Sequence, residues 1–90
     1  MKWEEITKTL PDRFVLIEAI KVSSNNHIRN LEDMVVIQDY DIPHQAWEGY
    51  KHFHKLYPAR ELYVFHTSRI DVEFVEEFSS KIHIPLSPLK

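Results

Sequence analysis

The sequence predicts an α+β protein, in which two helices cover one face of a three- to four-stranded sheet as a two-layer sandwich. Two observations carry this prediction. Apolar residues recur at helical spacing in two segments, each ended by a proline, and each segment leads into a run rich in branched and aromatic residues. A cluster of Ser and Asn separates the first such run from another. The predicted order is α-β-β-α-β, followed by a C-terminal segment that the pattern leaves open.

The first half of the chain is predicted to hold a short helix and a hairpin. Residues 3–10 have amphipathic helical spacing, and Pro11 ends the helix. Residues 14–22 form a strand that is apolar on both alternating faces, which is typical of a central strand. Residues 23–27 form the turn, and residues 34–40 return as the second strand. That strand can begin near Ile28 if a bulge lies around Glu32–Asp33.

The second predicted helix opens near Asp41 and Pro43 and runs to Tyr57. Asp41 is expected to cap free N–H groups, and Pro43 suits the first turn. Gly49 lies within this helix, so either another group approaches its backbone closely or its cost of about 1 kcal/mol is tolerated. The apolar residues of the helix form one mostly aromatic stripe: Ala46, Trp47, Tyr50, Phe53 and Tyr57.

Pro58 ends this helix, and residues 61–67 are predicted to form a third strand. From Ile70 onward, strand and helix periods overlap, and the pattern favours a strand followed by a helical turn. Residues 82–90 contain two prolines and are expected to form an edge segment or a loose end, with residues 85–90 as a loose tail. Ninety residues suffice for one domain with one small core, so residues 1–90 are expected to be a single domain.

The apolar pattern of residues 14–22 has a consequence for assembly. Two helices on one face leave the other face of this strand uncovered. Either the C-terminal segment or a second copy of the chain can cover it, and a small protein with a two-sided sheet often dimerises. We therefore expect a homodimer.

Composition excludes several classes of protein. The chain has no cysteine, which removes disulfides, thiolate metal sites and cysteine nucleophiles. One glycine cannot build a phosphate-binding loop. The longest apolar runs are four residues, far below a membrane span, and the acidic start is unlike a secretory signal. We expect a cytoplasmic protein without a cofactor.

The residues Trp3-Glu-Glu-Ile6, Pro11-Asp-Arg-Phe-Val-Leu-Ile-Glu-Ala-Ile20, Val36-Ile37 and the run from Tyr50 to Ser68 (YKxxHKxYPxRELYVFHTS) form a recognisable pattern. As a set they resemble a group of small bacterial proteins of unknown function. The resemblance covers about residues 3–69 and implies a bacterial intracellular protein. It implies no activity, because the pattern contains no catalytic motif.

One group of residues predicts a ligand site. His54 and His66 flank the Pro58 junction, and titratable and hydroxyl side chains follow the strand. Such a group can bind an anion or carry out hydrolytic acid–base chemistry, because histidine titrates near neutral pH. The competing interpretation is structural: His66 satisfies a backbone group, and the hydroxyls stabilise a turn. The candidate ligand residues are His54, Arg60, His66, Thr67 and Ser68.

The leading functional prediction is a non-enzymatic interaction or regulatory module whose partner is another protein. Trp and Tyr are typical anchors of interfaces, although the core must use some of them. The net charge of −3 argues against nucleic acid, and the six histidines lack ligand spacing, so no metal site is predicted. The candidate interface residues are Trp47, Tyr50, Tyr57 and Tyr63.

Overall fold

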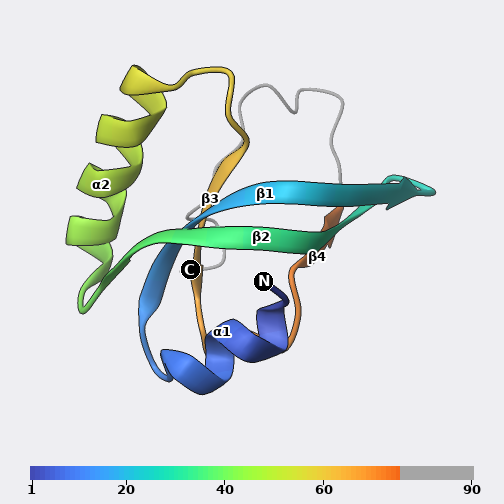
Figure 1. Ribbon diagram of the computed structural model, residues 1–90, viewed down its shortest axis with the longest axis horizontal. Coiled ribbons are helices and arrows are strands. Elements are labelled where there is room, and N and C mark those ends of the chain that lie inside the picture. The colour runs from blue at the N-terminus through green and yellow to red at the C-terminus, as the bar shows by residue number, and fades with distance from the viewer. Residues whose placement is uncertain (76–90) are drawn as a thin grey trace.

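The computed structural model describes residues 1–75 (Figure 1). Its elements are α1 (Trp3–Thr9), β1 (Phe14–Asn25), β2 (Ile28–Tyr40), α2 (Pro43–Leu56), β3 (Leu62–His66) and β4 (Glu73–Val75). The four strands form one antiparallel sheet in the order β3-β1-β2-β4. The α+β class and the order α-β-β-α-β are confirmed, and β4 supplies the fourth strand. The helical turn expected after β4 and the prediction for residues 82–90 lie outside the described residues.

The β1–β2 hairpin is longer than predicted and turns tightly at its tip. Asn26 and His27 have φ of 51° and 66°, the left-handed values that a two-residue hairpin turn of type I′ requires. Three register shifts interrupt the pairing, and one of them, between Lys21 and Val22, leaves Glu32 without a partner in the register. The bulge predicted around Glu32–Asp33 is therefore present, and it lets the polar start of β2 pair with the end of β1.

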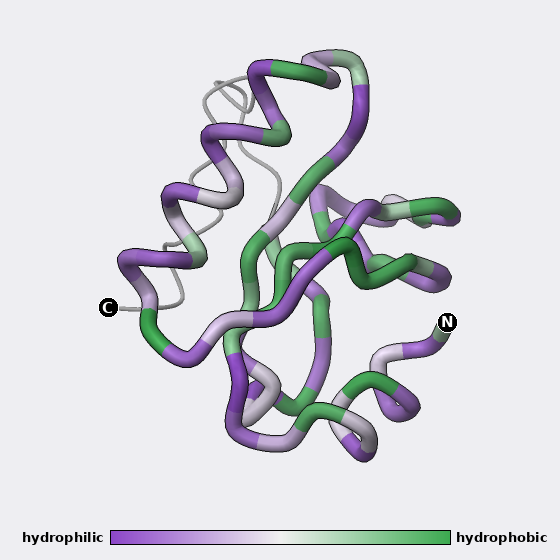
Figure 2. Tube along the Cα trace, turned by 60° about the vertical axis from the view of Figure 1, so that its left-hand side comes forward, coloured by the Kyte–Doolittle hydropathy of each residue, from purple (hydrophilic) through white to green (hydrophobic). Residues whose placement is uncertain are grey.

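The sheet is covered on both faces, one by each helix. On the α1 side, Trp3 and Ile6 pack with Val15 and Ile17 of β1. On the α2 side, Ala46 packs with Leu16, which lies between Val15 and Ile17 in β1. Figure 2 shows the strands between the two helices, with the hydrophilic residues of α2 turned away from the sheet.

This arrangement corrects the predicted placement of both helices on one face. Alternate residues of β1 point to opposite faces, and each set of apolar residues has its own helix. The molecule therefore has three layers instead of two. The two-sided apolar pattern of residues 14–22 did indicate that both faces pack against other elements, and each face is covered in part by its own helix.

The sheet also curls around the α1-side cluster. Tyr63 of β3 and Phe74 of β4 stand at opposite edges of the sheet, yet their ring centroids are 5.3 Å apart. Arg29 of β2 donates two hydrogen bonds to the Glu61 carboxylate, at 2.9 and 2.6 Å, across the same concave side. The α1-side face is thus concave, whereas α2 lies on the convex face.

Local contacts explain two features that the sequence left open. A Cβ built at Gly49 would lie 1.9 Å from the hydroxyl oxygen of Tyr40, so the glycine is present because Tyr40 approaches the helix backbone. Asp41 does not cap α2, which begins without a side-chain cap at Ile42. Instead, Asp39 and Asp41 both accept hydrogen bonds from Arg13, and they tie the start of β1 to the end of β2.

Candidate functional sites

The structure separates the predicted ligand residues into two groups at opposite ends of β3. Arg60 lies before the strand and contacts Glu18, which is the register partner of Leu62. His66 ends the strand opposite Phe14. A strand rises about 3.3 Å per residue, so the length of β3 keeps the two groups apart. His54 belongs with neither group by contact, because its ring stacks on Tyr50 within α2.

Thr67 is a structural residue. Its hydroxyl donates to the carbonyl oxygen of Leu10 at 2.7 Å and accepts from the backbone N–H of Arg13 at 3.0 Å. Its own N–H donates to the Arg13 carbonyl at 2.8 Å. The side chain is buried, and its hydroxyl oxygen already has a donor and an acceptor. Thr67 thus closes the junction between α1 and β1 and is not available to bind a ligand.

His66 and Ser68 do come together, and a third residue joins them. The Ser68 hydroxyl lies 2.7 Å from His66 Nδ1, and Asp12 Oδ1 lies 3.4 Å from His66 Nε2. The Ser68 N–H also donates to Nδ1, at 3.2 Å, so in the neutral ring Nδ1 accepts and Nε2 carries the proton. The chain of contacts from Ser68 through His66 to Asp12 is the arrangement of an activated serine nucleophile.

Sequence reasoning missed the part played by Asp12. Asp71 is closer to Ser68 along the chain, but its Oδ1 accepts the backbone N–H of Glu73 at 3.2 Å. Asp12 reaches His66 because it adopts a left-handed conformation, with φ of 57°, in the turn after Pro11. A polar residue in a proline turn that leads into a central strand was the one available signal.

The His66 arrangement lacks two elements of hydrolytic machinery. An acyl-transfer site needs N–H donors aimed at the developing oxyanion, and the Ser68 N–H is already directed at His66. Asp12 is exposed, so solvent weakens its hold on the ring. A local turn, stabilised by the His66 side chain, accounts for the same contacts.

A second candidate is an aromatic row on α2, formed by Trp47, Tyr50 and His54. Trp47 and Tyr50 have ring centroids 5.4 Å apart at 12°, and Tyr50 and His54 have centroids 5.5 Å apart at 7°. The three rings are therefore nearly parallel, and all three side chains are partly or largely exposed. Lys51 lies 5.6 Å from the centroid of the Trp47 ring and forms an ion pair with Glu48 at 3.0 Å.

The other predicted interface residues divide between the surface and the core. Tyr57 is 43% exposed, with Phe53 stacked on its ring and the Arg60 guanidinium 4.5 Å from the ring centroid. Tyr63 is only 3% exposed and belongs to the α1-side cluster, where it stacks on Phe65. The expectation that Tyr63 anchors a partner is not compatible with this burial. Its hydroxyl donates to Glu61, and burial together with this bond raises its pKa above the ordinary tyrosine value.

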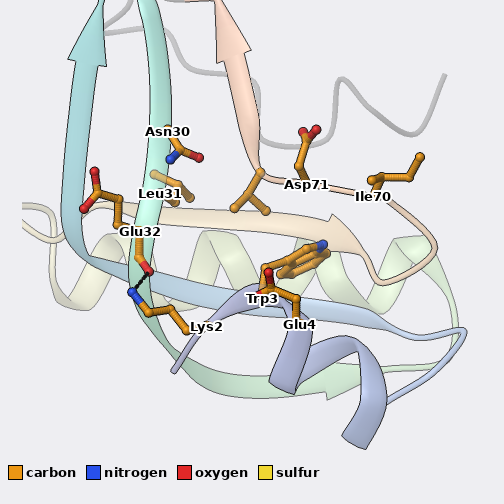
Figure 3. A pocket seen from close by; sticks show the side chains of 9 residues that line it. Lys2, Trp3, Glu4, Asn30, Leu31, Glu32, Ile70 and Asp71 are labelled. Carbon is orange, nitrogen blue, oxygen red and sulfur yellow. Dashed lines mark hydrogen bonds between the residues drawn. The ribbon is translucent and has the colours of Figure 1, made fainter.

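A cavity of about 340 Å³ lies where the start of α1 meets β2 and the loop before β4 (Figure 3). Trp3, Leu31 and Val72 supply its apolar lining. Two of its polar side chains have partners: Lys2 Nζ donates to the Glu32 carbonyl at 3.1 Å, and the Glu32 carboxylate pairs with Lys21. Sequence reasoning assigned none of these residues to a site, and the contact between Lys2 and Glu32 holds the start of α1 against β2.

Two findings limit the chemistry of the described part of the chain. In residues 1–75, no three His, Asp or Glu side chains converge as metal ligands. No helix in that range is long and apolar enough to span a bilayer. Comparison with protein families, curated proteins and solved structures finds no match to this chain, so its functional interpretation rests on the geometry described above.

Proposed function

We propose that the protein is a non-enzymatic interaction module that binds another protein through the aromatic row of α2. The observation that carries the proposal is the parallel stack of three rings, in which His54 is exposed, Trp47 is partly exposed and Tyr50 also packs against the core. Stacked rings hold one another in place, so they lose little conformational freedom when a partner covers them. Trp and Tyr are also the residues that contribute most to binding at protein interfaces.

The charges beside the row support a partner with acidic groups next to apolar ones. Lys51 and Lys55 lie on α2, whereas Glu48, which pairs with Lys51, is the one acidic residue of the helix. This basic surface belongs to a chain whose net charge is −3. Complementary charge steers association and selects among partners, while the buried rings supply affinity.

In-cell photo-crosslinking tests the proposal. A benzophenone amino acid in place of His54 is expected to capture one partner protein, because the side chain would lie within the interface. Ser24, exposed near the hairpin tip, is the control position. With the captured partner purified, Trp47→Ala is expected to weaken binding by about tenfold or more, with an unchanged melting temperature. Lys8→Ala on α1 is the matched control and should bind normally.

Two results would contradict this function. One is a set of adducts at position 54 no stronger than at position 24. The other is an affinity unchanged by Trp47→Ala in a folded variant. Either result would remove α2 as the binding surface.

A hydrolytic function is the second candidate, and it is favoured by one observation, the 2.7 Å contact between Ser68 and His66. A fluorophosphonate probe reacts with activated serines, and it would label the wild-type protein at Ser68 but not the Ser68→Ala variant. Asp12→Asn, which suits the left-handed backbone, would slow labelling. Absence of labelling in the folded wild-type protein rejects this candidate and leaves His66 as a turn residue.

A further inference from the structure

We propose that a second copy of the chain docks on the convex face of the sheet, at a surface formed by Glu18, Ile20, Val35, Tyr57 and Arg60. We call it the Val35 surface. The proposal uses none of the aromatic row, so it goes beyond the binding of another protein through α2. It also rests on different grounds from the sequence argument for a homodimer, which placed both helices on one face: here the starting point is the part of the convex face that α2 leaves exposed.

The pairing register places the strand residues of this surface together. Glu18 of β1 is paired with Val35 of β2, and their neighbours Ile17 and Val36 point into the α1-side cluster. Glu18 and Val35 therefore lie on the α2 side of the sheet. Ile20 is the extra residue of the bulge between Ala19 and Lys21. Ala19 packs against the α1-side cluster, whereas Ile20 does not belong to it.

A chain of contacts extends the surface to the end of α2. Arg60 Nη1 donates to Glu18 Oε1 at 3.4 Å, and the guanidinium lies over the ring of Tyr57. The strand residues and the end of the helix thus form one continuous surface. It lies beyond the part of the convex face that α2 covers through Leu16, Leu62 and Val64.

This surface exposes two large aliphatic side chains. Ile20 is 56% exposed and Val35 is 42% exposed, although both lie in strands that also build the core. With Tyr57, which is reached through Arg60, they supply the apolar groups that association would cover. Because the sheet is convex here, no element of the described chain closes over them.

The charges of the surface favour a second copy as the occupant. Glu18 and Arg60 are adjacent, so the surface holds one acid and one base and is neutral overall. In a two-fold contact, each Arg60 faces the Glu18 of the other copy, and the aliphatic side chains of the two copies meet. A surface that is neutral overall offers no net attraction to a strongly acidic or a strongly basic partner. Within residues 1–75, Arg60 donates one long hydrogen bond from five N–H groups, so it retains donors for a second carboxylate.

Sedimentation equilibrium over a wide concentration range tests the proposal on the full chain. The wild-type protein is expected to associate to a dimer, and Val35→Arg is expected to raise the dimer dissociation constant at least tenfold. Ile70→Arg is the matched control, because Ile70 is 93% exposed and lies outside the surface. It should leave the dimer intact. Melting temperatures confirm that each variant is folded.

A charge exchange keeps the test valid if Val35→Arg disturbs the strand. Arg60→Glu alone and Glu18→Arg alone should each weaken the dimer, because each places like charges together within and between copies. The double variant, Glu18→Arg with Arg60→Glu, restores opposite charges and should recover the dimer. A wild-type protein that stays monomeric at every concentration overturns the proposal, as does a dimer that both single charge variants leave unchanged. Neither result affects the crosslinking test at α2.

Discussion

At the scale of single residues, the structure assigns a definite packing role to Gly49 and Thr67, whose roles the sequence alone left open. Gly49 is the point where the Tyr40 hydroxyl reaches the backbone of α2. Thr67 is a buried hydroxyl that holds both Leu10 and Arg13. Neither role can be assigned from the sequence alone, because the contacts that define them come from other elements of the fold. Sequence reasoning could raise the close approach at Gly49 as an alternative, but it could not name Tyr40.

Gly49→Ala is expected to lower the free energy of unfolding by about 1–3 kcal/mol, even though alanine favours a helix over glycine by about 1 kcal/mol. The reason is the overlap of the new Cβ with Tyr40, which forces the ring or the helix to move. Urea denaturation measures the change. His52→Ala, on the exposed side of the same helix, is the control and should change stability by less than about 0.5 kcal/mol. A stabilised Gly49→Ala variant would show that Tyr40 does not hold this position.

Thr67→Val is expected to cost about 1–3 kcal/mol, because valine keeps the shape but leaves the Leu10 carbonyl and the Arg13 N–H without their partner. Thermal denaturation, with the same substitution at the exposed Thr9 as control, measures this cost. If Thr67→Val kept full stability, the hydroxyl would be dispensable and its role as a ligand group would have to be reconsidered.

At the scale of elements, patterns of spacing predicted the helices and strands well, whereas the ends of elements depended on contacts between segments. Residues 3–10 and 43–57 were predicted as helices, and the structure gives Trp3–Thr9 and Pro43–Leu56. The hairpin bulge was predicted from the polar pair Glu32–Asp33. Asp41 was misassigned as a helix cap because its partner, Arg13, comes from another element. The predicted ligand site is not assembled for a similar reason, since β3 separates Arg60 from His66 although the two are close in the sequence.

The protein is expected to lose stability at alkaline pH through Tyr63, which links β3 to the Arg29–Glu61 pair. Its pKa is raised in the folded state by burial and by the bond to Glu61, so the folded protein holds this proton more tightly than the unfolded chain. The stabilisation is complete below the unfolded pKa of about 10 and is lost as the pH rises above it. Melting temperature against pH, followed together with phenolate absorbance, measures the effect. Tyr63→Phe should flatten the alkaline decline, and an equal decline in both proteins would contradict the assignment.

At the scale of the whole molecule, the sheet is a curled layer between two helices, and a polar link spans its concave side. Arg29 and Glu61 come from segments that β1 separates in the sheet, yet they form a two-point hydrogen-bonded pair. The sequence could not predict the curl, because it results from accumulated bulges and twist. It therefore could not predict that the two edges would meet, or that each face would receive its own helix.

A double-mutant cycle on Arg29 and Glu61 is expected to give a coupling of about 1–2 kcal/mol, since both charges are partly buried and the pair is bidentate. The pair formed by Lys21 and Glu32 is the matched control. Its charged atoms are 3.7 Å apart and Lys21 is largely exposed, so its coupling should stay below about 0.5 kcal/mol. Equal couplings in the two cycles would mean that the Arg29–Glu61 pair on the concave side of the sheet contributes no more to stability than an exposed ion pair.

The tight turn at Asn26 and His27 has a consequence for the order in which the protein folds. The β1–β2 hairpin closes a very short loop, whereas β3 must return to β1 from beyond α2. Loop closure costs more entropy for distant segments, so the hairpin can form early and act as the template on which β3 pairs later. Substitutions at the turn, such as Asn26→Pro, would then slow refolding, while substitutions in β3 would mainly speed unfolding.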